Sequence, residues 1–496
     1  MTVLDEILAN GQRVAEHRPM PRAIVDRAAW EHAAHTLADE RATLLGLWGE
    51  RDAAHMTLRD GDNGKIAVLT FACPDGHFPS VGALHPPAQR LERAMRDLYG
   101  LIADGASDPR PWLDHGKWEN SRREARAPYE FREAEGEGVH RIVVGPIHAG
   151  IIEPGNFRFH AGGETVVRLE ERLGYVHKGI ESLMAGATLE RGAHLAGRTS
   201  GDSTVSYAIA FARAAEAALE VEPPPRAVWL RALMAEVERL ANHFGDIGAI
   251  CNDASFALMH AHTGVLRERV LRAADAAFGH RLMRDCVVPG GVACDLNDTA
   301  IAAIRALLAE VRRRFPPLIK LYDDTASLQD RTVGAGYLKP ELARQYGAGG
   351  YVGRASGRDF DARRDLAYPP YNHLRFVVPC RSDGDVNARV WIRIREAEQS
   401  LDLVEEILAR LPVGPFCTEL LIGGEAGEGL AVVEGFRGDI LVWLRLNADN
   451  SIARCHLRDP SWFQWPLLEA AIEGNIVADF PLCNKSFNCS YAGHDL

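Results

Sequence analysis

The stretch PPPRAVWLRALMAEVERLANHFGDIGAICND, residues 223–253, predicts a long buried helix in the second half of the chain. Three prolines precede it, and proline fits a helix best in its first turn. Apolar side chains then recur at 3-4-3-4-3 spacing, which places them on one face of a helix within a packed bundle. These side chains are Leu230, Leu233, Val237, Leu240, Phe244 and Ile247.

Ionisable side chains share this predicted helix. Glu236, Arg239, His243 and Asp246 recur at 3-4-3 spacing beside the apolar stripe, and Asp253 stands at the end of the helix. One interpretation is a helix face held by pairs three and four residues apart. The other is a buried polar lane that carries protons, with His243 and Asp253 among its members. The sequence leaves both open.

Regular elements continue on both sides of this helix. Further helices are expected at 299–315, ended by Pro316-Pro317, and at about 396–411. Short apolar runs predict strands at 141–144, 164–169 and 440–444. Residues 142–496 are therefore predicted to form one mainly α-helical domain with a few strands.

The first 113 residues predict a separate small α/β domain. Residues 65–71 are typical of a strand, and Leu91, Met95 and Leu98 mark one face of a helix from about 88 to 102. The stretch 114–141 is too polar to form a core, which indicates a charged linker or exposed arm. The fold class predicted for the whole chain is α+β.

Composition narrows the function classes. The formal net charge of −12 argues against nucleic-acid binding, which needs a basic face. No apolar run approaches the roughly 18–20 residues that cross a bilayer, and the first residues lack a secretion signal. We therefore expect a cytoplasmic protein that reaches a membrane only through partners. The nine cysteines include no CxxC pair, so a self-contained zinc or iron–sulfur site is not expected, and reduced thiols are.

A series of short motifs resembles, in order, the signatures of one family. GPIH at 145–148 and EPGNFRF at 153–159 resemble the opening of formate hydrogenlyase and hydrogenase-4 large subunits, and of the complex I 49 kDa subunit. GYVHKGIE at 174–181 resembles the segment that follows in these proteins. Later signatures are matched by residues 236–253, by 354–357 with Asp361 and Arg363, by Gly384-Asp385 with Arg389, and by EGFRGD at 434–439.

The N-terminal domain shares the resemblance. Glu92-Arg93 and DLYG at 97–100 are similar to the signature of the complex I 30 kDa subunit. The chain thus resembles a fusion of 30 kDa-like (1–113) and 49 kDa-like (142–496) modules, as in the large subunits of group 4 membrane-bound NiFe hydrogenases. The resemblance implies two kinds of partner: a small subunit that carries a 4Fe–4S cluster, and antiporter-like membrane subunits.

The residues that would hold nickel and iron are missing. The family uses four cysteines, two in an RxCGxC motif and two in a DPCxxC motif near the C-terminus. Here RTSGDS at 198–203 puts Ser200 and Ser203 at the first pair, and the segment after DFPL (479–482) puts Ser490 and Gly493 at the second. Asp459-Pro460 has no cysteine after it and is not the second motif. Protonated serine hydroxyls are poor nickel ligands, so no NiFe centre is expected.

The resemblance also indicates which polar residues remain. His148 matches the histidine that contacts quinone in complex I, but the quinone-binding tyrosine position falls on Gly201, with Tyr207 nearby in sequence. His148, Glu181 and Arg198 are expected to meet at the old active site, as a proton relay or cavity lining. Each has an alternative: His148 as a loop residue bonded to backbone, Glu181 as a surface carboxylate, and Arg198 in an exposed salt bridge.

These observations favour a large subunit of a membrane-associated oxidoreductase complex, without NiFe, that couples electrons from the iron–sulfur small subunit to a proton-translocating membrane arm. No cofactor is expected on this chain itself, although quinone is possible. The alternatives are a quinone-reducing subunit of the NADH:quinone oxidoreductase type, a true hydrogenase subunit, and a scaffold without redox work. The sequence does not name the electron donor, the acceptor or the pumped ion.

Overall fold

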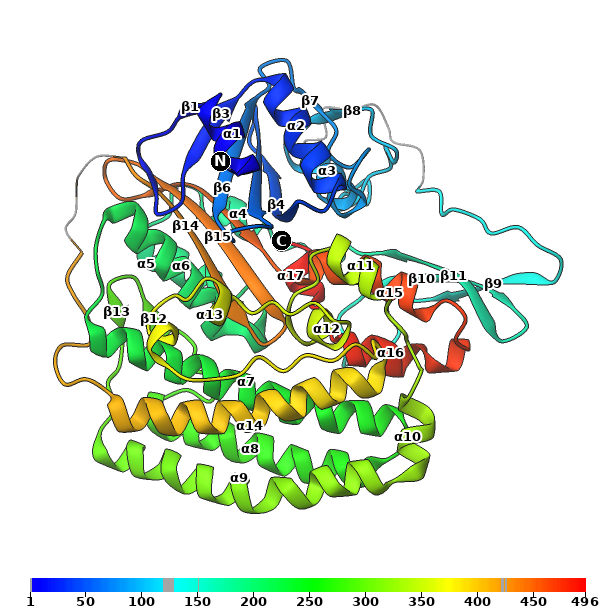
Figure 1. The fold of residues 1–496 in the computed structure, drawn as a ribbon, viewed down its shortest axis with the longest axis vertical. Coiled ribbons are helices and arrows are strands. Elements are labelled where there is room, and N and C mark those ends of the chain that lie inside the picture. Colours follow the sequence, from blue (N-terminus) through cyan, green and yellow to red (C-terminus); the bar gives the residue numbers. More distant parts are fainter. Residues whose placement is uncertain (1, 119–128, 150, 421–422, 424–425) are drawn as a thin grey trace.

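The N-terminal domain is a small sheet with helices that sits above a larger domain (Figure 1). The computed structural model describes residues 2–118, 129–149, 151–420, 423 and 426–496. The sheet has five strands in the order β1-β3-β6-β5-β4, with β3 and β6 parallel and the other pairs antiparallel. The elements of the N-terminal domain are α1 (Val3–Ala9), β1 (Gln12–Arg13), β3 (Arg22–Val25), α2 (Arg27–Ala38), β4 (Ala42–Gly49), β5 (Ala53–Asp60), β6 (Ile66–Ala72), β7 (His77–Pro79), α3 (Gln89–Tyr99) and β8 (Ile102–Asp104). Strands β7 and β8 pair with each other, outside the five-stranded sheet.

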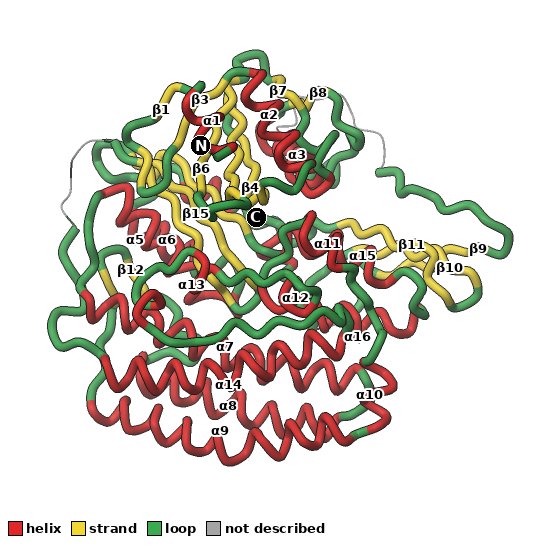
Figure 2. The backbone as a smooth tube through the Cα atoms, viewed as in Figure 1, coloured by secondary structure: helices red, strands yellow, loops and turns green. Residues whose placement is uncertain are grey.

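Long helices form the base of the second domain (Figures 1 and 2). They are α7 (Pro225–Asp253), α8 (Ala257–Phe278), α9 (Asp298–Asp324) and α14 (Val386–Arg410). The predicted apolar stripe of α7 is buried along its whole length, from Leu230 to Ile247. Figure 2 shows these helices packed side by side beneath the strands, so α7 lies inside the molecule rather than at its surface.

The expected end of the helix at Pro316-Pro317 is wrong. Helix α9 continues through both prolines to Asp324. A proline removes one backbone donor and releases the carbonyl four residues earlier. Both prolines and the residues Arg312 and Arg313 lie on the exposed face of α9, where water can bond the released carbonyls. The apolar face, including Phe315, stays packed, and this packing carries the helix past the prolines.

Most strands of the second domain form two further sheets. An arm of β9 (Val139–Val144), β10 (Asn156–Gly162) and β11 (Thr165–Arg172) extends from the body in Figure 1, in the order β11-β10-β9. The other sheet contains β14 (Glu428–Gly435), β15 (Gly438–Leu446) and β16 (Ile452–Arg458). Its edge is completed by β2 (His17–Arg18) from the N-terminal domain, parallel to β14. The two domains therefore share a sheet.

The predicted linker 114–141 is only partly a linker. Residues 119–128 lie outside the described part of the chain, but strand β9 already begins at Val139. Before it, the Tyr129 hydroxyl donates to Glu170 at 3.0 Å, and the Arg132 backbone N–H donates to the same carboxylate at 2.6 Å. The described flanks of this stretch thus pack against β11.

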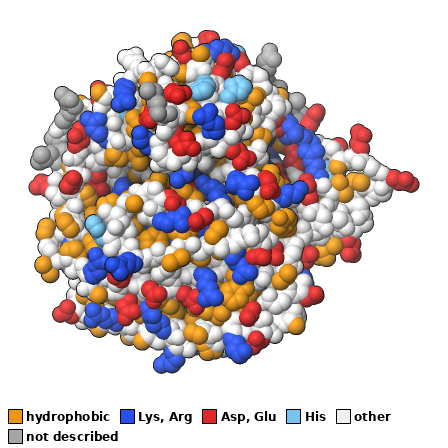
Figure 3. All heavy atoms as spheres, viewed as in Figure 1, with side chains coloured by type: hydrophobic (Ala, Val, Ile, Leu, Met, Phe, Trp, Pro, Cys, Tyr) orange, Lys and Arg blue, Asp and Glu red, His pale blue; other side chains and the backbone are white. Residues whose placement is uncertain are grey.

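Shorter helices connect these layers. They are α4 (Ile180–Met184), α5 (Leu189–Ala196), α6 (Thr204–Leu219), α10 (Ala326–Thr332), α11 (Pro340–Gln345), α12 (Gly350–Ala355), α13 (Ala362–Asp365), α15 (Ser461–Ile472), α16 (Phe480–Phe487) and α17 (Tyr491–His494), with a hairpin of β12 (Val287–Val288) and β13 (Gly291–Val292). The α+β prediction is confirmed. Within the described residues, no helix is both long and apolar enough to span a bilayer. Acidic and basic side chains are interspersed over the face in Figure 3.

Candidate functional site

The two segments that resemble nickel-ligand motifs meet in the interior. Ser200 precedes a short 3-10 turn at Gly201–Ser203, and Ser490 is the N-cap of α17. The two hydroxyl oxygens lie 3.0 Å apart, which is a hydrogen bond, and both serines are buried. Residues 290 positions apart in sequence thus touch at the place where two ligand pairs would face each other.

Both hydroxyls donate one hydrogen bond and accept another within the protein. Ser200 also bonds Asp202 Oδ1 at 2.9 Å, and Ser490 Oγ accepts the backbone N–H of Gly493 at 2.9 Å. The backbone N–H of Ser490 donates to Ser461 Oγ at 2.8 Å. A hydroxyl has one donor and two acceptor positions, so these contacts use the donor and one acceptor position of each serine.

An arginine fills the space beside these serines. Arg437, in the turn between β14 and β15, donates two bonds to the Asp202 carboxylate, at 2.7 and 2.6 Å, and one to Ser203 Oγ at 3.3 Å. Burial alone would raise the pKa of Asp202, but Arg437 outweighs burial and lowers that pKa to about 2. This charged pair beside the serines therefore stays ionised at neutral pH.

The last of the four positions has no room for a side chain. A Cβ atom added at Gly493 would lie 2.4 Å from Asp459 Oδ2. Asp459 is held there by the Tyr207 hydroxyl at 2.6 Å and by the Ser461 backbone N–H at 2.8 Å. Burial, together with this carboxylate, raises the pKa of Tyr207 well above its ordinary value, so Tyr207 remains a donor.

These residues do not fit a NiFe centre. The four positions offer three hydroxyls already bonded to protein groups, and a glycine against which a carboxylate packs. Thiolates are the soft ligands that such a centre needs. Elsewhere in the described residues, no group of three or more His, Cys, Asp or Glu side chains is arranged to hold a metal ion.

His148 lies at the edge of this site beside Tyr491. Its ring is 5.4 Å from that of Phe157 and 6.4 Å from that of Tyr491, measured between centroids. His148 Nδ1 approaches the Pro146 carbonyl at 3.3 Å, and Nε2 is buried without a hydrogen-bond partner among the described residues. The Tyr491 hydroxyl is likewise buried without a well-aligned hydrogen bond in that part of the chain. Its pKa is raised by burial, while Asn484 opposes the rise.

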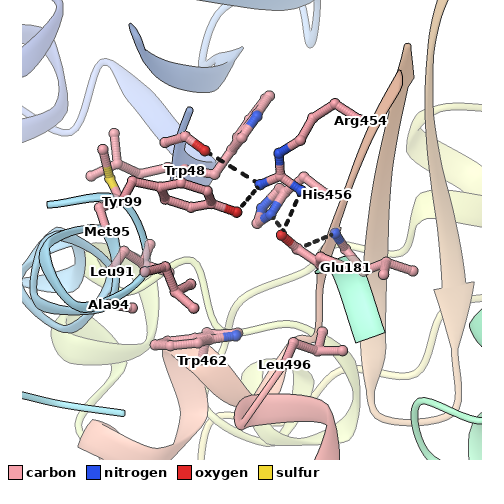
Figure 4. A pocket seen from close by; sticks show the side chains of 14 residues that line it. Trp48, Leu91, Ala94, Met95, Tyr99, Glu181, Arg454, His456, Trp462 and Leu496 are labelled. Carbon is pink, nitrogen blue, oxygen red and sulfur yellow. Dashed lines mark hydrogen bonds and ion pairs between the residues drawn. The ribbon is translucent and has the colours of Figure 1, made fainter. Parts of the chain in front are cut away.

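Glu181 lies in a separate pocket between the two domains (Figure 4). Its carboxylate forms an ion pair with Arg454 at 2.8 Å. It also accepts hydrogen bonds from His456 Nδ1 at 2.8 Å and from the Leu457 backbone N–H at 2.9 Å. Figure 4 shows Tyr99 on the other side of the Arg454 guanidinium, and its hydroxyl accepts a bond at 2.6 Å. Burial opposes ionisation of Glu181, but Arg454 and His456 lower its pKa to about 2.

Arg198 faces outward from the site. Its guanidinium binds both oxygens of Asp285, at 2.6 and 2.7 Å, and is partly exposed. Among the described residues, none of the hydrogen bonds or ion pairs joins Glu181, Arg198 and His148 to one another. The three segments therefore surround the old site without bringing these side chains into contact, and only His148 borders it.

The polar residues of α7 are buried and paired with other elements. His243 Nε2 and Glu396 of α14 are 2.8 Å apart, and Glu236 accepts bonds from Arg363 at 2.9 Å and Tyr371 at 2.7 Å. One pair within the helix exists, between Glu236 and Arg239 at 3.5 Å. These side chains are nearly inaccessible to solvent, so they form an internal network rather than a solvated face.

The C-terminal end of α7 is less buried than its middle. Asp253 is half-buried in the last turn of the helix, and burial raises its pKa. Asp246, two turns earlier, accepts Asn488 Nδ2 at 3.0 Å and pairs with Arg393 at 3.1 Å. Asn488 lies two residues before Ser490, so α7 contacts the segment that closes the site. Whether protons move along these groups stays a prediction.

Sequence reasoning missed the residues that close the site. The motifs exclude Asp459 with its proline, do not include Tyr491, and contain Arg437 only as part of a turn. No clear signal marks Asp459, because the strand before it, β16 (IARCHLR), mixes apolar and basic residues. Tyr491 carries no signal either, since its position beside His148 depends on the path of the whole chain.

Comparisons with known proteins agree with this architecture. Residues 23–129 match the family of the respiratory-chain NADH dehydrogenase 30 Kd subunit, and residues 256–422 match that of the 49 Kd subunit. Formate hydrogenlyase subunit 5 of Escherichia coli (strain K12) is 30% identical over 84% of this chain and 77% of its own length. Hydrogenase-4 component G of the same organism is 30% identical over 92% of this chain and 82% of its own.

A solved structure shares the fold. A chain of the membrane-bound sulfane sulfur reductase, an archaeal respiratory membrane complex, aligns with a TM-score of 0.69 at 24% identity, over 73% of this chain and all of that one. The order of the matched modules and the identity to these relatives agree. The chain belongs to the family of fused complex I 30 kDa- and 49 kDa-like large subunits that includes formate hydrogenlyase subunit 5 and hydrogenase-4 component G.

Proposed function

We propose that this chain is the large subunit of a membrane-associated oxidoreductase complex and works without a NiFe centre. The observation that carries the proposal is the direct bond between Ser200 and Ser490, closed further by Arg437 and Asp459. Electrons would reach the complex through a 4Fe–4S cluster in a small subunit, and their transfer would be coupled to a proton-translocating membrane arm of antiporter-like subunits. The chain would lie on the cytoplasmic face of the membrane.

An exposed apolar loop supports docking to a partner. Between β9 and β10, Ile147 is 84% exposed and Ile151 is 95% exposed, with Ile152 beside them at 44%. Clustered exposed apolar side chains mark interaction surfaces more often than isolated ones do. The relatives named above are subunits of hydrogenlyase and hydrogenase systems, and the solved neighbour is part of a membrane complex. The iron–sulfur small subunit is the partner that we infer for this loop.

Quinone reduction is the second candidate, favoured by His148 and Tyr491. Both side chains border the closed site, and each has a buried polar atom without a good partner in the described chain. A histidine and a tyrosine are the groups that can donate hydrogen bonds to the two oxygens of a quinone headgroup. Tyr491 would then act in place of the tyrosine that is missing at Gly201. A true hydrogenase role finds no support in the bonded serines.

The test uses the intact complex, purified from its native membrane. We expect far less than one nickel per chain by metal mass spectrometry, and no hydrogen uptake with viologen dyes. Stoichiometric nickel together with hydrogen uptake would overturn the proposal. Tyr491→Phe separates the two candidates, because it should abolish quinone reduction if that headgroup binds here and leave it unchanged otherwise. Intact assembly with no redox activity towards any donor would instead indicate a scaffold.

A further inference from the structure

Two of the nine cysteines come together at the β12–β13 hairpin. Cys286 immediately precedes β12 and Cys294 follows β13, so the antiparallel pairing of Val287 with Val292 brings their strands side by side. The backbone N–H of Ala293 donates to the Cys286 carbonyl at 2.8 Å, which extends this pairing to the cysteines. Both thiols point to one acceptor, the Phe278 carbonyl at the end of α8, at 3.4 Å from Cys286 and 3.9 Å from Cys294.

The two thiols have different surroundings. Cys286 is buried, whereas Cys294 is partly exposed to solvent. The interaction between the two neighbouring thiols raises the pKa of Cys286 and lowers the pKa of Cys294. A thiolate is the reactive form of cysteine. The accessible member of the pair is therefore the better nucleophile, and the buried member stays protonated.

The backbone next to Cys286 is strained. Met283 has φ of 52° and Asp285 has φ of 63°, a region that costs side chains other than glycine free energy. Asp285 is also the carboxylate that holds Arg198, two residues before Ser200. The hairpin packs against α5 and α6, as its position in Figure 1 indicates. The dithiol thus lies one residue from the ion pair that anchors the loop of the closed site.

We propose that Cys286 and Cys294 form a reversible, redox-active dithiol that reacts with disulfides. The Cys294 thiolate attacks one sulfur of an external disulfide, which gives a mixed disulfide and releases one external thiolate. Cys286 then loses its proton to water and attacks the Cys294 sulfur, which releases the second external thiolate. The protein dithiol is oxidised to a disulfide, and the external disulfide is reduced to two thiols. The site is independent of the function proposed above.

A dithiol of this kind suits a cell compartment that keeps most thiols reduced. Disulfides in such compartments are usually transient and redox-sensing. Five other cysteines, Cys73, Cys251, Cys455, Cys483 and Cys489, are buried singly, and Cys380 and Cys417 are exposed. Exposed single thiols should stop at the mixed disulfide, because no second thiol is there to displace the adduct. The expected products therefore differ between the pair and the other cysteines.

The experiment treats the reduced, full-length protein with oxidised glutathione and maps its cysteines by mass spectrometry. We expect a Cys286–Cys294 disulfide, with two thiols lost and no glutathione retained at this hairpin, and its reversal by dithiothreitol. In Cys286→Ser, glutathione should stay on Cys294. In Cys294→Ser, Cys286 should remain unmodified. Cys380→Ser is the matched control and should form the hairpin disulfide as the wild type does.

The mapping of the wild type decides the question even if a serine variant fails to fold. A glutathione adduct that accumulates on Cys294 of the wild type would overturn the proposal. So would a disulfide from Cys294 to Cys417 or to a second chain, or an unreacted hairpin when Cys380 is fully modified. Formation of the hairpin disulfide with a lag behind a transient Cys294 adduct supports the order of steps.

Discussion

At Gly493, the space for a side chain is missing as well as the thiol. A serine could in principle revert to cysteine by one atom, but Asp459 occupies the space into which any side chain at 493 would project. Arg437 and Asp202 likewise take the volume between the two ligand segments. The place where the four positions meet is therefore a hydrogen-bonded junction, and a set of cysteines alone would not make it a metal site.

The close contact of Asp459 with Gly493 predicts that one added methyl group at residue 493 lowers the stability of the chain. Gly493→Ala should destabilise the chain by about 1–3 kcal/mol, because the new Cβ overlaps a carboxylate that Tyr207 holds in place. Gly201→Ala is the matched control: nothing lies within 4 Å of the added atom. Alanine there should be neutral or slightly stabilising, since glycine loses more chain entropy on folding. Chemical denaturation of both variants measures the difference, and equal stability would contradict a filled site.

Glu181 gives a prediction about acid stability. Its pKa falls from an ordinary 4.5 to about 2, so its contribution is fully present above about pH 4.5 and is lost as pH falls towards 2. The shift corresponds to roughly 3 kcal/mol. Glu181→Gln should lower stability at neutral pH by about that amount and flatten the acid dependence. The exposed Glu31, paired with Arg27 one helical turn away, gives the control Glu31→Gln, which should change the melting temperature little.

A different result would revive the proton-relay interpretation of Glu181. If Glu181→Gln melts like the wild type but the assembled complex loses proton translocation, then the carboxyl group must change protonation during turnover. The ion pair with Arg454 and the bond from His456 argue for the structural outcome. His456 is held neutral by burial, which lowers its pKa, so Arg454 is the charge that matters.

Elements were predicted where periodicity was strong. The α7 stripe, the strand at 65–71 and the helix near 88–102 all correspond to observed elements, because burial of one face is written locally in the sequence. The continuation of α9 through two prolines was not predictable, since it depends on a packed face whose partners lie on other helices. The pairing of β2 with β14 is non-local for the same reason.

The network across α7, α12 and α14 permits a prediction about buried charge. Arg354 donates to Glu396 at 2.9 Å and to Glu434 at 2.9 Å, and all three side chains are buried. Burial and the nearby Asp361 raise the pKa of Glu434 to about 7, in spite of Arg354. Arg354→Gln removes the cation that bonds both buried carboxyl groups and should cost about 3–5 kcal/mol.

Arg364 provides the control for this variant. It lies ten residues further along, on α13, and pairs with Asp359 and Asp365 near the surface. Exposed ion pairs contribute about 0–1 kcal/mol, so Arg364→Gln should melt nearly as the wild type does. Thermal melting of the purified proteins compares the two. If Arg354→Gln melts normally but stops proton translocation, the network is a proton path rather than a structural brace.

Across the whole molecule, the two modules are more entangled than the sequence indicated. Besides the shared sheet, Arg22 of the N-terminal domain binds Glu428 at 2.6 Å in a buried pair, and Trp112 Nε1 approaches His494 Nε2 at 3.3 Å. The motifs identified both modules. They could not place Tyr491 beside His148 or Glu181 beside Arg454, because those contacts join segments that lie far apart in the chain.

The remaining prediction concerns assembly and rests on the exposed loop before β10. Ile151 is 95% exposed, a poor arrangement for an isoleucine unless a partner covers it. Burial of such a side chain contributes about 1.5–3 kcal/mol, so Ile151→Asp should weaken binding of the iron–sulfur small subunit by about tenfold or more. Val413 is equally exposed, but it follows α14, on the side of the molecule away from the β9–β11 arm in Figure 1.

Val413→Asp therefore adds the same charge at the same exposure and should leave small-subunit binding unchanged. The measurement is co-purification of the small subunit with tagged large-subunit variants, followed by titration of the separated subunits. Neither variant changes a buried residue, so both should melt like the wild type, and loss of binding cannot be ascribed to unfolding. If both variants bind normally, the loop faces another partner or solvent. If both lose binding, the interface extends to the α14 end, because only a surface that spans both sites makes them equivalent.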